Sequence, residues 1–201
     1  MVIINKDNRT ASIGVLALQG AFREHISSIK KCGANAVEIK FPGQLNEVDG
    51  LIIPGGESTT INKLIDKYDF KKYLDDFYNS GKAVYGTCAG LILIAKRVIN
   101  DDFGLNYIDV DVERNAYGRQ IDSFEEYVAL SFDKSQKFKA IFIRAPKITR
   151  AGPEVDILSE INDNIILVRQ KNVLASTFHP ELGEDRRVHE YFLKMAVKTI
   201  K

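Results

Sequence analysis

The sequence has few of the residues that mark several specialised classes of protein. It contains no tryptophan and only two cysteines, Cys32 and Cys88, among its 201 residues. Two cysteines are too few for a disulfide framework, and neither a C-x-x-C pair nor a histidine cluster gives the spacing of a zinc site. We therefore expect no bound metal and a reducing, cytoplasmic environment.

Long apolar runs and an excess of one charge are also missing. The longest apolar stretches, GLIIPG and GLILIA, are far shorter than the roughly 20 residues of a membrane-spanning helix. The leading sequence MVIINKDNRT lacks the basic start and apolar centre of a signal peptide. With 28 basic and 27 acidic residues the net charge is +1, and no basic stripe with interleaved aromatic residues indicates a nucleic-acid surface. We expect neither a membrane nor a nucleic acid as a partner.

The composition is that of an ordinary globular protein, with 45% hydrophobic and 27% charged residues, and the length predicts one domain. In the first half, strand-like runs alternate with helical patterns. Strands are expected at residues 11–18, 36–41, 50–54 and 83–86, and helices at 23–33, 61–68 and 69–81, with Ser58, Thr59 and Thr60 as N-cap candidates for the second helix. This alternation predicts an α/β fold in which helices cover both faces of a mostly parallel sheet.

The second half has shorter, more strand-like runs. They fall at residues 107–113, 124–132, 139–146, 156–161, 164–170 and 173–178, and a closing helix is expected at 184–200. We expect these strands to join the same sheet in mixed or antiparallel pairing. No repeat, low-complexity tract or linker interrupts the chain.

The stretch VYGTCAGLIL places Cys88 between Gly86 and Gly90, where a predicted strand passes into a helix expected near Leu91. It is the cysteine counterpart of the G-x-S-x-G nucleophile elbow, in which glycines let strand and helix approach closely and expose the side chain between them. The start of a helix favours the nucleophilic thiolate. The alternative is a glycine-rich turn that holds a small buried thiol.

A nucleophilic cysteine needs a base, and the sequence offers three histidines. His179 directly follows a predicted strand, and in an extended chain Glu181 would project to the same side and orient its ring. His25 lies in the polar first helix, and we expect His189 at the surface of the last helix. His179 is the favoured base, with a solvated loop around HPE as the alternative.

The third element is IIPGGEST, in which a strand is followed by Gly55, Gly56 and a helix start. Backbone N–H groups at such a turn can hold the oxyanion of a tetrahedral intermediate, and those of Gly56 and Ala89 are the expected pair. A phosphate-binding loop is an alternative, although the Gly-Lys-Ser/Thr ending of a P-loop is absent. The other alternative for this segment is a purely structural turn.

Together these motifs resemble the class I, or triad, glutamine amidotransferases. The segments LALQGAFREH, LNEVDGLIIPGGESTT, VERNAYGRQIDSFE, FIRAP and FHPELGEDRRVH are similar, in order and spacing, to the PdxT family, the glutaminase subunits of pyridoxal 5′-phosphate synthase. The resemblance covers the chain from about residue 12 to about residue 197. It implies a flavodoxin-like three-layer sandwich, with residues 12–201 as the glutaminase domain and residues 1–11 as an N-terminal extension.

The resemblance also implies the chemistry. Cys88 would attack the side-chain amide of L-glutamine, with His179 and Glu181 completing the triad, and a glutamyl thioester would be hydrolysed to glutamate. No cofactor is implied. Residues that match the glutamine-binding positions of the family are Gly55, Gly56, Glu57, Ser58, Arg114, Ile143 and Arg144.

A partner is implied as well. In the PdxT family the ammonia passes to a synthase subunit, a (β/α)₈ barrel that forms a dodecamer decorated by glutaminase subunits and makes pyridoxal phosphate. Gln19 matches a residue near that contact, where docking organises the oxyanion site. Three other hypotheses stay open, namely a glutaminase subunit of another amidotransferase, a cysteine peptidase on the same fold, and a redox-sensing flavodoxin-like protein without catalysis.

Overall fold

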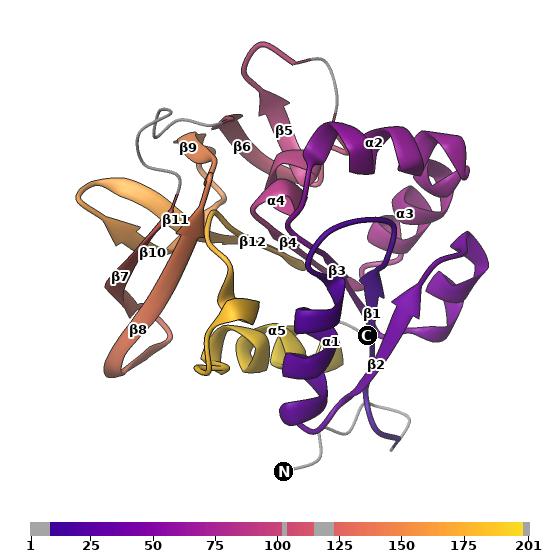
Figure 1. Cartoon of the computed structure of the whole chain (residues 1–201), viewed down its shortest axis with the longest axis horizontal. Helices are drawn as coiled ribbons and strands as arrows, with labels where there is room; N and C mark the ends of the chain where they lie inside the picture. Colours follow the sequence, from indigo (N-terminus) through magenta and orange to yellow (C-terminus); the bar gives the residue numbers. More distant parts are fainter. Residues whose placement is uncertain (1–8, 102–103, 115–122, 199–201) are drawn as a thin grey trace.

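Five parallel strands form one side of the main sheet in the computed structural model, which describes residues 9–101, 104–114 and 123–198 (Figure 1). In spatial order they are β2 (Asn35–Ile39), β1 (Ser12–Leu16), β3 (Gly50–Ile53), β4 (Ala83–Thr87) and β12 (Val173–Ser176). Every residue of β3, β4 and β12 is buried, as expected for parallel strands covered on both faces. The predicted parallel core is therefore confirmed.

Beyond β12 the sheet becomes mixed. β11 (Asn164–Gln170) pairs antiparallel with β12, β9 (Lys147–Ala151) and β10 (Asp156–Ile161), and β6 (Ile108–Glu113) and β5 (Ala95–Val98) complete the sheet. The predicted positions of β10 and β11 are confirmed. β5 and β9 have no counterpart among the predicted strands, because AKRV and KITRA carry too few apolar residues to stand out.

The helices form the two outer layers. α2 (Ser58–Lys67), α3 (Phe70–Asn79) and α4 (Ala89–Ile94) pack on one face of the sheet, and α1 (Phe22–Lys31) and α5 (Arg187–Lys198) pack on the other (Figure 1). In α3 the buried residues are Phe70, Leu74 and Phe77, which recur at the spacing of one helix face. Two short 3₁₀ helices, η1 (Pro42–Glu47) and η2 (Pro180–Leu182), follow β2 and β12. The predicted three-layer sandwich is confirmed.

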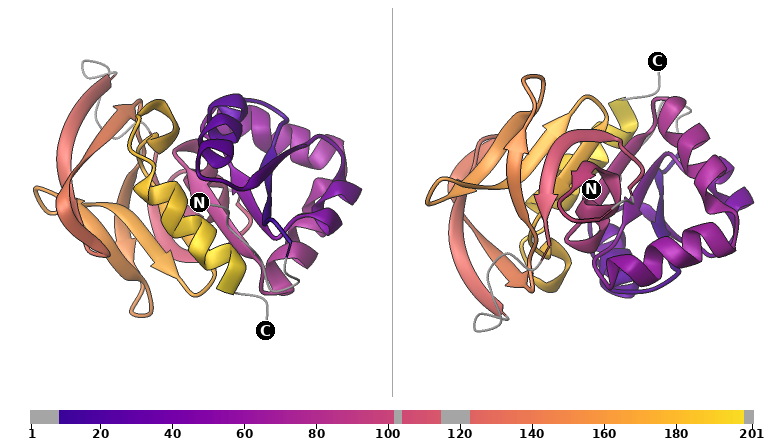
Figure 2. Two further views of the ribbon diagram at one scale, coloured as in Figure 1. Left: turned by 90° about the horizontal axis from the view of Figure 1, so that it is seen from below. Right: turned by 90° about the horizontal axis from the view of Figure 1, so that it is seen from above.

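Two strands stand apart from the main sheet. β7 (Ser123–Leu130) and β8 (Asp133–Ile143) form a separate hairpin, so the expectation that they join the main sheet is wrong. Buried Phe138 and Phe142 of β8 contact Phe178, which follows β12, and Figure 2 shows the hairpin beside α5. Alternating apolar residues predict a strand with one buried face, but they do not specify the sheet to which that strand belongs.

Helix α2 begins earlier than its predicted N-cap residues suggest. Its N-cap is Glu57, whose carboxylate accepts hydrogen bonds from the N–H groups of Thr59 and Thr60, at 3.1 and 2.7 Å. Ser58, Thr59 and Thr60 lie inside the first turn, so their prediction as N-caps is wrong. A glutamate is a less common cap than serine or threonine, and the sequence therefore pointed one to three residues too far.

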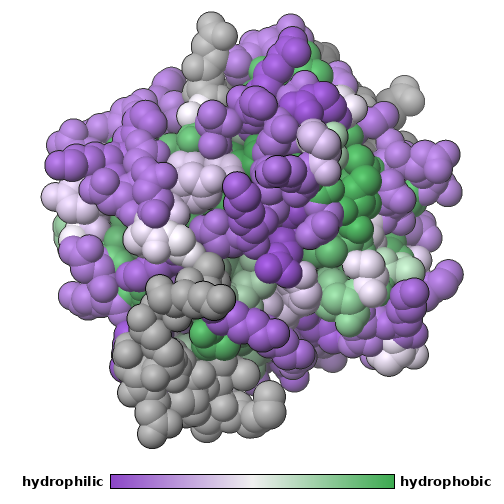
Figure 3. Space-filling model, turned by 180° about the vertical axis from the view of Figure 1, so that it is seen from behind, coloured by the Kyte–Doolittle hydropathy of each residue, from purple (hydrophilic) through white to green (hydrophobic). Residues whose placement is uncertain are grey.

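The first described residues, 9–11, pack onto this domain. Ala11 is buried, and the Arg9 guanidinium lies 3.0 Å from Oδ1 of Asp49. Figure 3 shows polar residues over most of the face opposite to that of Figure 1, with smaller apolar areas between them. In the described parts of the chain, no helix has the length and apolar character needed to cross a bilayer.

Candidate active site

Cys88 occupies a sharp turn between β4 and α4. Its backbone has φ 50° and ψ −102°, a left-handed conformation that is rare for any residue other than glycine. The Cys88 N–H donates to the carbonyl of Ser176 at 2.8 Å, which ties the turn to the end of β12. Helix α4 begins at Ala89, two residues before the expected start at Leu91. Such local strain is typical of functional turns and supports the interpretation of this segment as an elbow.

The glycines on either side of Cys88 allow close backbone packing. A Cβ on Gly90 would overlap the carbonyl of Ile53 in β3, and a Cβ on Gly86 would lie 2.7 Å from the carbonyl carbon of Gly90. Both distances are far below ordinary van der Waals contact, and the obstacles are backbone atoms of the sheet and helix. The elbow therefore requires glycine at both positions.

Gly90→Ala should lower the free energy of unfolding by about 3 kcal/mol or more, because neither β3 nor α4 can move to admit a methyl group. Gly43→Ala is the matched control, since a Cβ at Gly43 meets nothing within 4 Å, and its change should stay within about 0.5 kcal/mol. Urea unfolding of the three proteins measures both values. Equal midpoints for the two variants would contradict the tight packing at Gly90.

His179 and Glu181 lie beside this turn and are largely buried, at 8% and 6% exposure. Nδ1 of the His179 ring is 2.7 Å from Oε1 of Glu181. The backbone N–H of His179 donates to the carbonyl of Ile141 in β8. The sequence analysis expected an extended chain between His179 and Glu181, and this expectation is wrong. Pro180 begins the 3₁₀ helix η2, and this turn brings the carboxylate back to the imidazole.

The electrostatics of the site favour a charged imidazole. Burial lowers the pKa of His179, but hydrogen bonds and charge interactions with Cys88 and Glu181 outweigh it and raise the pKa to about 10. Burial likewise raises the pKa of Glu181, but the neighbouring His25 and His179 hold it below its usual value. His179 is thus suited to hold a proton between a sulfur and a carboxylate.

A pocket of about 380 Å³ opens over Cys88 and His179. Eleven of the predicted site residues line it, and the twelfth, Glu181, lies behind His179. The eleven are Gln19, Gly55, Gly56, Glu57, Ser58, Cys88, Ala89, Arg114, Ile143, Arg144 and His179. The lining also includes Ile92 and Leu182, which sequence reasoning missed because single apolar residues carry no signal of a pocket.

Gly55 and Gly56 pass directly over the reactive groups. A Cβ on Gly55 would overlap the His179 ring, and the Gly55 N–H donates to the Thr87 hydroxyl at 3.0 Å. On the other side of Gly56, Oε1 of Gln19 accepts a hydrogen bond from the Glu57 N–H at 2.9 Å. The Gly55–Gly56 segment is therefore held at both ends, and Gln19 lies at the rim of the pocket.

Two arginines stand at the mouth of the pocket. The Arg114 guanidinium lies 3.0 Å from Oδ2 of Asp101 and 3.5 Å from Oε1 of Glu57. Exposed Arg144 follows β8 with a left-handed backbone of φ 43°. Residues 115–120 of the motif RNAYGRQ lie outside the described residues. Arg114 is thus paired with two carboxylates, and Arg144 adds a second guanidinium to the lining of the pocket.

The other two histidines lie behind the pocket. His189 is fully buried and its Nε2 is 3.0 Å from Nδ1 of His25, so the prediction that it lies at the surface is wrong. His189 shares the buried face of α5 with Phe192, three residues along, whereas the expectation of a surface position rested on the charged residues EDRR at the start of the helix. His25 is also buried, and its Nε2 lies 3.3 Å from Oε2 of Glu181.

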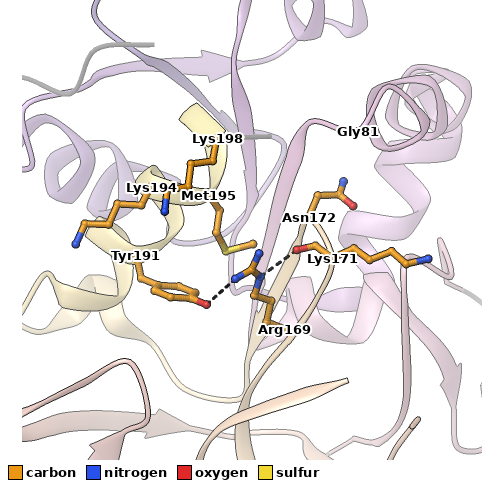
Figure 4. A pocket seen from close by; sticks show the side chains of 8 residues that line it. All are labelled: Gly81, Arg169, Lys171, Asn172, Tyr191, Lys194, Met195 and Lys198. Atoms are coloured by element: carbon orange, nitrogen blue, oxygen red, sulfur yellow. Dashed lines mark hydrogen bonds between the residues drawn. The ribbon is translucent and has the colours of Figure 1, made fainter. Parts of the chain in front are cut away.

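A second pocket, of about 460 Å³, lies at the opposite end of the parallel strands, beside the end of α5 (Figure 4). Arg169, Lys171, Lys194 and Lys198 line it, and the Arg169 guanidinium donates to the Tyr191 hydroxyl and to the Lys171 carbonyl. The lining contains neither a cysteine nor a histidine. Within the described ranges, no group of three or more histidine, cysteine, aspartate or glutamate residues has the arrangement of a metal site.

Residues 15–198 match the model of the SNO glutamine amidotransferase family. The chain belongs to that family. It is 54% identical over 187 residues to pyridoxal 5′-phosphate synthase subunit PdxT of Shouchella clausii, an alignment that covers 92% of this chain and 95% of the relative. The subunit of the same name from Bacillus licheniformis is 52% identical over 188 residues, with 93% and 95% covered.

Solved structures agree with this SNO-family assignment. A crystal structure of a glutamine amidotransferase superposes with a TM-score of 0.86 at 45% identity, covering 92% of this chain and 98% of that one. The structure of PurLQS from Thermotoga maritima has a TM-score of 0.66 at 16% identity, covering 94% of this chain and 96% of that one, which shows a shared fold alone. The resemblance found in the sequence is thereby confirmed.

Proposed function

We propose that this chain hydrolyses L-glutamine to L-glutamate and ammonia and supplies the ammonia to a synthase subunit for pyridoxal 5′-phosphate biosynthesis. The observation that carries the proposal is the buried His179–Glu181 pair beside Cys88 on the floor of one pocket. Membership of the SNO glutamine amidotransferase family and the PdxT relatives support it.

In the proposed reaction Cys88 is the nucleophile. The raised pKa of His179 means that the proton of the Cys88 thiol already resides on the imidazole, and the thiolate sulfur forms a bond with the side-chain amide carbon of glutamine. The tetrahedral intermediate collapses when His179 returns the proton to the departing nitrogen, so that ammonia leaves and a glutamyl thioester remains. His179 then takes a proton from water, whose oxygen attacks the thioester, and the thiol is restored as glutamate leaves.

Glu181 acts through His179 in this scheme. Its carboxylate accepts the Nδ1–H of His179 at 2.7 Å, which keeps Nε2 available for Cys88 and stabilises the imidazolium. The oxyanion is held by the backbone N–H groups of Gly56 and Ala89, which border the pocket beside Cys88.

The rest of the pocket binds the amino-acid end of glutamine. Arg114 and Arg144 at its mouth suit the α-carboxylate, since a guanidinium fork donates two parallel hydrogen bonds. Gly55, Glu57, Ser58 and Ile143 complete the lining around the substrate, mainly through backbone groups. The Glu57 side chain itself serves as the N-cap of α2, and its hydrogen bonds with Thr60 and Thr59 lower its pKa to about 2.

The partner in this proposal is the synthase subunit, a (β/α)₈ barrel in a dodecamer decorated by glutaminase subunits. Gln19 at the rim of the pocket is a contact or activation residue for that subunit, since it is hydrogen-bonded next to Gly56. Residues 12–201 form the glutaminase domain and residues 1–11 an extension. Both cysteines are free thiols, in keeping with a cytoplasmic location.

The test is glutamate release from L-glutamine by the purified chain, alone and with a synthase subunit. We expect the partner to raise the rate, because docking at Gln19 would organise the adjacent Gly56 N–H. Pyridoxal phosphate should form in the complete mixture with glutamine as the nitrogen source. If a partner that binds leaves glutamine untouched, the pocket serves another substrate and the proposal is wrong.

A further inference from the structure

A chain of buried polar groups extends behind the catalytic pair and is not used by the reaction steps above. Oε1 of Glu181 contacts His179, and its other oxygen, Oε2, lies 3.3 Å from Nε2 of His25. Nδ1 of His25 is 3.0 Å from Nε2 of His189. The side chains of His25 and Glu181 are fully buried. The four residues come from α1, α5 and the segment that begins η2.

The hydrogen-bonding needs of Glu181 decide which nitrogen of His25 carries a proton. Oε2 makes no well-aligned hydrogen bond within the described residues and is sealed from solvent, so the neighbouring His25 nitrogen must supply its donor. A neutral His25 would then carry its proton on Nε2 and accept at Nδ1. Burial lowers the pKa of His25 by more than the Glu181 charge raises it, and so keeps this pKa below its ordinary value. Burial therefore favours the neutral ring.

His189 fixes this arrangement from the other side. The lone pair on Nδ1 of His25 calls for a donor, which is the Nε2–H of His189 at 3.0 Å. Nδ1 of His189 is then a buried acceptor without a partner among the described residues. Burial lowers the pKa of His189 to about 3, so this ring also stays neutral. A buried acceptor without a partner destabilises the fold less than a buried N–H without one. The hydrogen bond from His189 to His25 is therefore the favourable direction.

The same His25 nitrogen also reaches the opposite wall of the site. Nε2 of His25 is 3.1 Å from the Thr87 hydroxyl, which accepts the hydrogen bond of the Gly55 N–H. Thr87 directly precedes Cys88, and Gly55 directly precedes Gly56. The His25 imidazole therefore contacts both Glu181, which orients the base His179, and Thr87, which holds the Gly55–Gly56 segment.

We propose that His25 is a positioning residue for the glutaminase reaction, with its single Nε2–H shared between the Thr87 hydroxyl and the Glu181 carboxylate and its tautomer fixed by His189. Proton transfer still takes place between Cys88 and His179. His25 supplies the fixed donor that keeps the Glu181 carboxylate charged and correctly aimed while the imidazolium forms and disappears. The catalytic role assumed for Glu181 rests on the function proposed above.

The ionisable groups around His25 are few. Glu181 and His179 face it from the η2 segment, His189 from α5 and Glu24 from its own helix, and the Tyr85 ring of β4 packs edge-on at 6.5 Å. Burial raises the pKa of Tyr85 far above its ordinary value, so the phenol stays neutral. His179 has a pKa of about 10, and Glu24 is exposed on the outer side of α1, so a change in the acid range after substitution of His25 reports on Glu181.

The first test reads the tautomers in the unaltered full chain by two-bond ¹H–¹⁵N correlation of the imidazole rings. We expect neutral rings with the proton on Nε2 for both His25 and His189 from about pH 6 to pH 8. A proton on Nδ1 of His25, or a doubly protonated His25, would overturn the proposal. This measurement needs no glutamine, so it stands even if the chain acts on another substrate.

The second test compares His25→Met, which removes the donor, with His25→Gln, whose amide can still donate near the position of Nε2. In the complex with the synthase subunit, His25→Met should lower kcat for glutamate release about 10- to 100-fold and leave KM within about twofold. The acid limb of its kcat profile should move to higher pH, because Glu181 loses a donor to its charged form.

His25→Gln should recover most of the lost kcat and return the acid limb towards that of the parent. Thermal unfolding of both variants checks that the proteins compared are folded. Equal losses in the two variants, or an unchanged kcat and acid limb in His25→Met, would show that His25 only fills space. If the parent itself releases no glutamate, the proposed function has failed, whereas the tautomer measurement still tests the network.

Discussion

Cys88→Ala is expected to lower glutamate release by at least about 10⁴-fold and to leave the fold intact. Without the sulfur no thioester can form, and water would have to attack the amide directly. Alanine keeps the Cβ of Cys88 and removes only the sulfur, so the turn loses little apolar contact. The measurement is glutamate release in the presence of the synthase subunit, with circular dichroism as the check on folding.

Cys32→Ala is the matched control. Cys32 is the other free cysteine and is also buried, but it lies at the C-cap of α1, away from the pocket. Burial raises the pKa of the Cys32 thiol to about 11, so it remains protonated and unreactive. A chloroketone analogue of glutamine should label the parent and Cys32→Ala, but not Cys88→Ala. Labelling that depends on Cys32 would contradict the assignment of the nucleophile.

The Cys88 variant should also report on His179. Cys88 is one of the groups that raise the pKa of His179, so this pKa should fall when the sulfur is removed. Titration of the imidazole by NMR in both proteins measures the change. An unchanged His179 pKa would mean that the two residues are not coupled.

The parts of the site that could be predicted from the sequence are those formed by residues close together along the chain. Gly86 and Gly90 around Cys88 have one physical explanation, a close strand-to-helix turn, and the structure contains that turn. The pairing of His179 with Glu181 was also accessible, because both follow β12 directly. The assumed extended chain between them was wrong, since Pro180 begins a 3₁₀ turn.

The contacts of His25 could not be predicted in this way. A histidine in a polar helix carries no local sign that it will meet Glu181 and His189, which are far along the chain. The same limit applies to the β7–β8 hairpin, whose alternation indicates a buried face while the partner surface is set by Phe178 and α5. Tertiary packing determines the contacts of His25 and the placement of the hairpin, and no local sequence pattern indicates such packing.

His179→Asn should reduce glutamate release by about 10⁴-fold as well, because the described lining of the pocket contains no second histidine that could hold the Cys88 proton and return it to ammonia. The double variant Cys88→Ala/His179→Asn should be no slower than the slower single variant, because residues that act as one unit do not contribute independently. Losses that multiply in the double variant would show that His179 acts separately from Cys88.

The same variant tests the electrostatics of the site through the dependence of stability on pH. The pKa of His179 is raised from 6.5 to about 10 in the folded chain, so its charged form adds stability that is complete below pH 6.5. This contribution falls as the pH rises and vanishes near pH 10. The parent should therefore exceed His179→Asn in unfolding free energy by about 1 to 3 kcal/mol at pH 6, with the difference shrinking above neutrality. A difference that grows with pH would mean that the buried ring is neutral, and that Glu181 is held by His25 alone.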